Sequence, residues 1–241
     1  MQWWEYLYNP EFFSLEAGLI KYAQLSWIIP GSLGLLLGRL RRSVHRRILL
    51  FVCYTVLMEY VSTLPGATGF LGIRGNYPIY HVLTPGLFAV LYHVFGPVLI
   101  SEQRRYLRWL PPLIFVFIAL GNYAYLGTLA VFPTVTAGLY ALSGIVLCLA
   151  YLGYLLRTLT VERLELDPLF WFAAAGLIYY SGSVLMLAAI NFLNFDIDLF
   201  DSVFAVARVL TLLFTAGLSI ALIVPPAESA ANSTVLTTAT P

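Results

Sequence analysis

Apolar positions dominate this chain in runs of about 20 residues, separated by short segments that carry charges, proline or glycine. An α-helix of that length spans the hydrocarbon core of a bilayer, which is about 30 Å thick. Most of the runs contain too few charges to give a helix the polar face that a water-soluble bundle requires. The pattern therefore predicts an all-α integral membrane protein, a seven-transmembrane helix bundle. The predicted spans are 17–38, 48–64, 79–100, 110–131, 134–157, 169–193 and 203–224.

Composition agrees with a membrane environment. The 241 residues are 60% hydrophobic and 10% charged, and the mean hydropathy is +0.85, whereas soluble domains carry about a quarter charged residues. The formal net charge of +1 gives no basic excess that would favour a nucleic acid as partner. The sequence therefore predicts the lipid bilayer as the main partner and no nucleic acid.

The distribution of positive charge predicts how the bundle is oriented. Connections rich in Lys and Arg stay on the cytoplasmic side of a membrane. Ten of the 13 basic residues lie in the connections after the first, third and fifth spans, and six of the 12 acidic residues lie in the N-terminal segment and in a connection on the opposite side. We therefore predict a multi-pass protein of the bacterial inner membrane, with the N-terminus outside and the C-terminus inside. The ten are Arg39, Arg41, Arg42, Arg46, Arg47, Arg104, Arg105, Arg108, Arg157 and Arg163.

The two ends of the chain and its cysteines complete the predicted organisation. Residues 1–224 are predicted to form the transmembrane domain, and 225–241, rich in Ala, Ser and Thr, a disordered cytoplasmic tail. The N-terminus is aromatic and acidic rather than basic, so we expect no cleaved secretory signal. Cys53 and Cys148 both lie in apolar runs, which predicts buried hydrophobic side chains and favours neither a disulfide nor a thiolate metal site.

Three ionisable residues in the predicted spans form the candidate ligand-binding site: Glu59, His81 and Arg208. An ionisable group at membrane depth costs about 2.5 to 3.5 kcal/mol on insertion scales, so each is a functional candidate. Measured from the outer ends of their spans, Glu59 and Arg208 lie at about the same depth, roughly 7 Å, and His81 is slightly shallower. Together they could bind a small polar or zwitterionic ligand, with the planar guanidinium gripping an anionic group.

Two other roles fit the same residues. Glu59 and Arg208 could instead form a structural ion pair, because buried charges normally find partners. A proton relay through Glu59 and His81 is a third hypothesis. Hydroxyl, tyrosine and asparagine side chains at helical spacing in four spans predict a shared polar interior, and interhelical hydrogen bonds are the favoured explanation for them. They are Thr55, Ser62, Thr63, Thr136, Tyr140, Ser143, Tyr151, Tyr154, Tyr180, Ser183, Asn191, Thr211, Thr215 and Ser219.

The sequence lacks the residues that several cofactors require. The single lysine, Lys21, lies in the first span, so a retinal Schiff base in the last span is excluded. His81 and His93 lie about 120° apart around one helix and cannot face one haem, and His45 lies in the predicted inner loop. We expect His93 to be an interior side chain. Glu59 and His81 are too few ligands for a zinc or di-iron centre. The sequence predicts no cofactor and no metal.

One resemblance bears on function. Glu59 late in the second span, followed by Asn76 and by Tyr80 and His81 at the start of the third, resembles stand-alone seven-span inner-membrane proteins of Bacteroidetes, as does the run FWFAAAGLIYYSG over 170–182. Some members of that group are similar to the membrane input modules of sensor histidine kinases. The resemblance implies a sensory role, and since no kinase region follows here, signalling through a partner protein.

We therefore expect a non-enzymatic sensory or ligand-binding membrane module that acts through a protein partner at the cytoplasmic face. One alternative is a structural subunit of a membrane complex, in which the buried charges only hold helices together. Another is a transporter or enzyme acting on a lipid or a small molecule. The sequence decides neither the ligand nor the partner, and it leaves an enzymatic activity open while favouring none.

Overall fold

The computed structural model describes residues 22–23, 25–38, 43–63, 77–100, 108–126, 133–158, 163–192 and 197–225. The N-terminal segment, most connections and the predicted tail from residue 226 onward lie outside these ranges. Within them the chain forms seven α-helices, one 3₁₀ turn and no strand. The helices are α3 (Ile28–Leu36), α4 (Ser43–Thr63), α5 (Tyr77–Leu99), α6 (Leu110–Leu126), α7 (Thr134–Thr158), α8 (Pro168–Phe192) and α9 (Ile197–Ile223), with the turn η5 at Leu164–Leu166 before α8.

The all-helical prediction is confirmed for the described residues, and each α-helix overlaps one predicted span. Four helical stretches are long and apolar enough to cross a membrane. The helix α4 is not among them because it carries Arg46, Arg47 and Glu59, and α3 and α6 are shorter. The number of spans and their orientation therefore stay predictions. The four stretches are Pro78–Leu99, Thr134–Thr158, Pro168–Ala189 and Ala205–Ile223.

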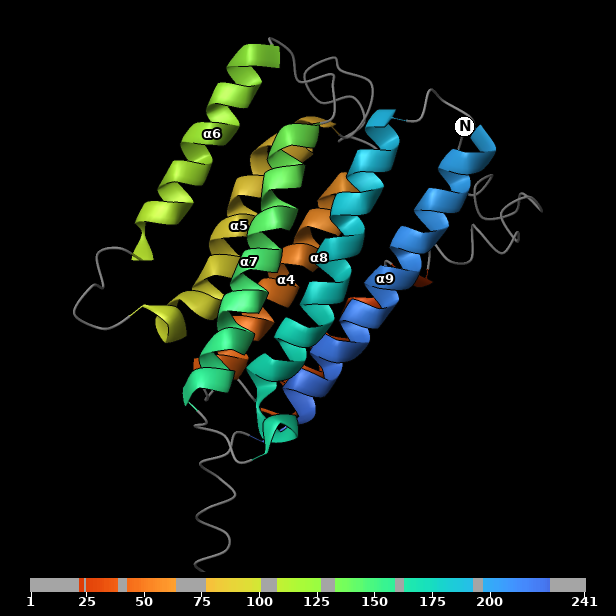
Figure 1. Cartoon of the computed structure of the whole chain (residues 1–241). Coiled ribbons are helices and arrows are strands. Elements are labelled where there is room, and N and C mark those ends of the chain that lie inside the picture. Colours follow the sequence, from red (N-terminus) through yellow and green to blue (C-terminus); the bar gives the residue numbers. More distant parts are fainter. Residues whose placement is uncertain are drawn as a thin grey trace, which may run out of the picture.

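The helices pack side by side, with α4 in the middle of the bundle and α6 at its edge (Figure 1). The helix α8 packs most extensively, against α7 on one side and α9 on the other. The helix α4 contacts α3, α5, α8 and α9, whereas α6 contacts α5 and α7. Polar residues of α4 therefore meet several helices at once.

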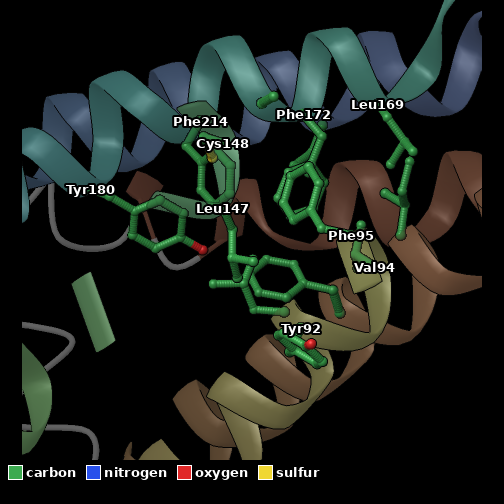
Figure 2. Packing of buried hydrophobic residues seen from close by; sticks show 14 of the residues in the cluster. Tyr92, Val94, Phe95, Leu147, Cys148, Leu169, Phe172, Tyr180 and Phe214 are labelled. Carbon is green, nitrogen blue, oxygen red and sulfur yellow. The ribbon is translucent and has the colours of Figure 1, made fainter. Parts of the chain in front are cut away.

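Aromatic rings from five parts of the chain form the centre of the core. The Phe172 ring of α8 lies edge-on to Phe51 of α4, Phe95 of α5 and Phe214 of α9, at centroid distances of 5.2, 5.2 and 5.6 Å. Figure 2 shows Phe172 and Phe95 pointing toward each other between the helices. Trp27, just before α3, adds an edge contact to Phe214 at 5.8 Å. Such edge-to-face pairs add about 0.5 to 1.5 kcal/mol each beyond area burial, and here they join α4, α5, α8 and α9.

The outer surface of the bundle is apolar, which is compatible with contact with lipid. On α6, Phe115 and Ala119 are buried and Phe115 stacks on Phe88 of α5 at 4.3 Å. The rest of α6 is turned outward, with Phe117 71% and Tyr125 88% exposed. The prediction that both cysteines are buried is wrong for Cys53, which is exposed, while Cys148 is buried. A helix surrounded by lipid is apolar on all faces, so apolar neighbours in sequence do not predict burial.

Two contacts between distant segments define one end of the bundle, which we call the basic end. His45 at the start of α4 bonds the Val224 carbonyl after α9, and Arg47 bonds the Val94 carbonyl near the end of α5. The basic end therefore holds the starts of α4, α6 and α8 and the ends of α5, α7 and α9. Five arginines lie there: Arg46, Arg47, Arg108, Arg157 and Arg163. We call the opposite end the far end.

Candidate functional site

Glu59 is the carboxylate that the sequence places inside the bundle. It lies four residues before the end of α4, about 6 Å from the far end of that helix at 1.5 Å per residue, and it is half-buried. Its charge interacts with Tyr179 of α8, which in turn interacts with Tyr80 of α5. The Tyr179 ring stacks on Phe214 of α9 at 4.8 Å, with 13° between the planes. The acidic group is thus within electrostatic range of a tyrosine of α8 that packs on α9.

A second polar pair lies on the neighbouring face of α8. The hydroxyl oxygens of Tyr140 on α7 and Tyr180 on α8 are 3.1 Å apart, and the two rings are perpendicular at 5.6 Å. Tyr180 is fully buried (Figure 2). Gly144 of α7 makes room for its ring, because a Cβ at that position would lie 2.6 Å from the ring carbons. The predicted hydroxyl positions on α7 and α8 therefore do meet in the interior.

His81 lies on a different side of α5 from this cluster. It is half-buried, and its ring lies edge-on to Tyr123 of α6 at 6.2 Å. The preceding residue, Tyr80, packs against the buried core. Consecutive helical residues are rotated by about 100°, so Tyr80 faces the Glu59 cluster and His81 faces α6.

Arg208 lies near the start of the apolar stretch Ala205–Ile223 of α9. The helix α9 begins at Ile197, before the predicted span, so Arg208 is its twelfth residue, about 16 Å from its first at 1.5 Å per residue. Arg208 is half-buried and shares a helix face with Thr215, seven residues on. The Thr215 hydroxyl donates to Ser26 Oγ before α3 at 3.0 Å. Phe214, which contacts Tyr179, lies on a face about 120° away from Arg208. A direct pair between Glu59 and Arg208 stays a prediction.

The other predicted polar positions divide into two groups. Most hydroxyls donate to the carbonyl four residues earlier in their own helix, as Thr55, Thr211 and Ser219 do. This bond satisfies a hydroxyl in an apolar surrounding without a partner helix. Bonds between helices are made by Asn122, which donates to Thr136 Oγ1 at 3.1 Å, and by the tyrosines. A polar residue at helical spacing therefore identifies an interhelical contact only in some cases.

The two prolines of α5 do not break that helix, which continues from Tyr77 to Leu99. Beside Pro85, the Tyr54 hydroxyl of α4 donates to the Leu83 carbonyl at 2.9 Å. The hydroxyl occupies the space over Gly86, where a Cβ would collide with it. The Pro85 and Gly86 positions are thus part of a packing contact between α4 and α5.

The basic end contains polar contacts that the sequence did not reveal. The Tyr151 hydroxyl of α7 donates to Asp167 Oδ2, and Asp167 Oδ1 accepts the Leu169 N–H at the start of α8. His45 was expected in a loop, but α4 begins at Ser43 and the ring is fully buried. His93 was expected inside and is exposed. Asp167 directly precedes Pro168, and an aspartate before a proline is a signal for the start of a helix. This signal could have identified the contact of Asp167 at the start of α8.

A groove of about 220 Å³ opens between α8 and α9. Its lining is apolar, and the three predicted site residues are not part of it, although Ala207 precedes Arg208. The groove therefore suits an apolar occupant rather than the predicted polar ligand. It is lined by Gly182, Leu185, Met186, Ala189, Val206, Ala207 and Leu210.

Metal-binding groups do not gather in the part of the chain that the structure describes, where no three His, Cys, Asp or Glu side chains come together. Comparison of the chain with protein-family models, curated proteins and solved structures finds no match.

Proposed function

We propose that this protein is a seven-span sensory or ligand-binding module of the bacterial inner membrane, with the N-terminus outside and the C-terminus inside. The basic end faces the cytoplasm, where positively charged connections are retained. A small polar or zwitterionic ligand binds in the far half of the bundle around Glu59, His81 and Arg208. A protein partner at the cytoplasmic face receives the signal.

The observation that carries this proposal is that the Glu59 carboxylate lies within electrostatic range of Tyr179. A carboxylate at membrane depth is expensive unless it has a task or a partner. The Tyr179 ring stacks on Phe214 of α9, and Phe214 contacts Phe172 and Phe51 at the centre of the core. A cation bound at Glu59 would change the environment of the ring that connects α8 to α9.

The same contacts provide a route to the basic end. The helix α9 ends where Val224 accepts the hydrogen bond from His45 of α4. The helix α8 begins where Asp167 accepts the bond from Tyr151 of α7. A shift of α8 against α9 at Tyr179 would therefore move the segments that a cytoplasmic partner could contact. This hypothesis assumes two arrangements of α8 relative to α9. It requires a ligand that binds one arrangement more tightly than the other.

The experiment measures thermal unfolding of the purified protein in mild detergent, with amino acids and betaines as zwitterionic probes. We expect at least one probe to raise the melting temperature of the wild type and of Tyr60→Phe, whose side chain is 63% exposed next to Glu59. Glu59→Gln should abolish the shift, because the amide cannot attract a cationic group. Unchanged probe affinity in Glu59→Gln would refute the site.

A structural subunit is the second candidate function, and α6 favours it. This helix packs on α5 and α7 through one narrow stripe and turns large apolar side chains outward. Such a face can pack against a helix of another subunit as well as against lipid. Purification from native membranes in mild detergent, with mass spectrometry of co-purifying proteins and small molecules, separates the two functions. A stoichiometric partner without a bound small molecule would favour the subunit.

A further inference from the structure

Two arginines at the basic end are held by the same helix terminus. Arg47 of α4 donates from Nη1 to the Val94 carbonyl at 2.9 Å and from Nε to the Ser43 carbonyl at 3.2 Å. Arg108, just before α6, donates from Nη2 to the Ile100 carbonyl at 3.3 Å. Val94 lies in the last turns of α5, and Ile100 directly follows that helix. Both guanidinium groups are therefore bonded to backbone carbonyls near the end of α5.

Arg46 adds a third positive charge to this cluster. His93, exposed on α5, lies within electrostatic range of Arg46, Arg47 and Arg108, so the three arginines surround one position. Burial, followed by the charges of Arg108 and Arg46, lowers the pKa of the Arg47 guanidinium from its ordinary value. Arg47 precedes the predicted span 48–64 and so lies at the level of the lipid headgroups.

Arg46 and Arg47 place two positive charges at this end of the bundle. Among the residues that the structure describes, neither Arg46 nor Arg47 pairs with a carboxylate. Like charges repel one another, most strongly where water is excluded. An anion placed between them would relieve this repulsion.

We infer that Arg46, Arg47 and Arg108 form a binding site for a phosphate group at the basic end. Guanidinium groups bind phosphate oxygens through paired charge-assisted hydrogen bonds, and basic pockets at the cytoplasmic ends of membrane helices hold anionic lipid headgroups. The described bonds of Arg47 use Nε and Nη1, and Nη2 can donate to the ligand. The phosphate belongs to an anionic phospholipid or is a free anion. The site lies at the other end of the bundle from Glu59, so it does not depend on the proposed ligand.

The test titrates purified protein in neutral detergent with phosphatidylglycerol, phosphatidylcholine or inorganic phosphate at constant ionic strength, and follows the melting temperature. We expect phosphatidylglycerol to stabilise the wild type more than phosphatidylcholine does. The double variant Arg46→Gln, Arg108→Gln should lower the apparent affinity by at least about tenfold, because it removes two charged hydrogen-bond donors to the phosphate.

The matched control removes two charges from the same end. Arg157 and Arg163 are exposed, and the variant Arg157→Gln, Arg163→Gln should keep the wild-type response to phosphatidylglycerol. An equal response to inorganic phosphate would assign the site to the free anion. No response to either, or equal losses in both double variants, would overturn the site. If the first double variant does not fold, Arg46→Gln alone replaces it, because Arg46 makes no described hydrogen bond and its loss leaves the helix contacts intact.

Discussion

His45 and Val224 are 179 residues apart in the chain, and a hydrogen bond of 3.0 Å from His45 Nε2 to the Val224 carbonyl joins them. The bond connects the start of α4 to the end of α9. We expect His45→Leu to lower the stability by about 1 to 3 kcal/mol, because the carbonyl loses its donor and a fully buried ring is replaced. The melting temperature in detergent measures this.

Ser43→Ala is the control for His45→Leu. Ser43 is exposed in the same helical turn, and the change keeps its backbone carbonyl, which accepts from Arg47. Its melting temperature should match that of the wild type. Equal stability of His45→Leu and the wild type would mean that the α4 and α9 ends are not joined in this way.

Gly144 and Gly138 lie on the same helix, α7, and offer a matched pair of substitutions. A Cβ at Gly144 would lie 2.6 Å from the Tyr180 ring, whereas nothing lies within 4 Å of a Cβ at Gly138. Gly144→Ala should destabilise the protein by about 1 to 3 kcal/mol through overpacking and displace Tyr180 from Tyr140. Gly138→Ala should be neutral or slightly stabilising, since alanine favours helix. Similar melting temperatures for the two variants would contradict the packing of α7 on α8.

The relation between Glu59 and Arg208 can be measured with a double-mutant cycle. The charge of Glu59 acts on Tyr179, and Tyr179 stacks on Phe214, which lies on a face of α9 about 120° away from Arg208. We therefore expect the stability changes of Glu59→Gln and Arg208→Leu to add within about 0.5 kcal/mol in the ligand-free protein. A double variant more stable than either single variant would instead identify a structural ion pair.

The orientation of the bundle can be tested with cysteine labelling in intact cells. After replacement of Cys53 and Cys148 by serine, a single cysteine is introduced at Thr128, between α6 and α7, or at Thr160, between α7 and α8. A membrane-impermeant maleimide should label Thr128→Cys only, since the basic end faces the cytoplasm. Both variants should react after the membrane is permeabilised. Labelling of Thr160→Cys alone in intact cells would reverse the topology.

The candidate site was predictable only in part. Glu59 is the one acidic residue in its apolar run, so sequence alone identifies it as an unusual group. Its neighbour Tyr179 comes from a helix more than 100 residues later, and spacing along one helix carries no information about such contacts. His81 turns toward Tyr123 of α6 because the rotation of α5 is fixed by the packing of Tyr80, a choice that periodicity left open.

The length and polarity of the apolar runs determined by themselves where this chain is helical, because helix formation in an apolar solvent depends on local backbone bonds. Only the tertiary structure decided which faces are inside. Lipid and protein interior are equally apolar, so hydrophobicity did not distinguish Cys53, which is exposed, from Cys148, which is buried. The sequence also placed His93 inside and His45 in a loop, whereas packing exposes the first and buries the second. The contacts between helices decide these positions through shape and hydrogen bonding, which no single run of residues contains.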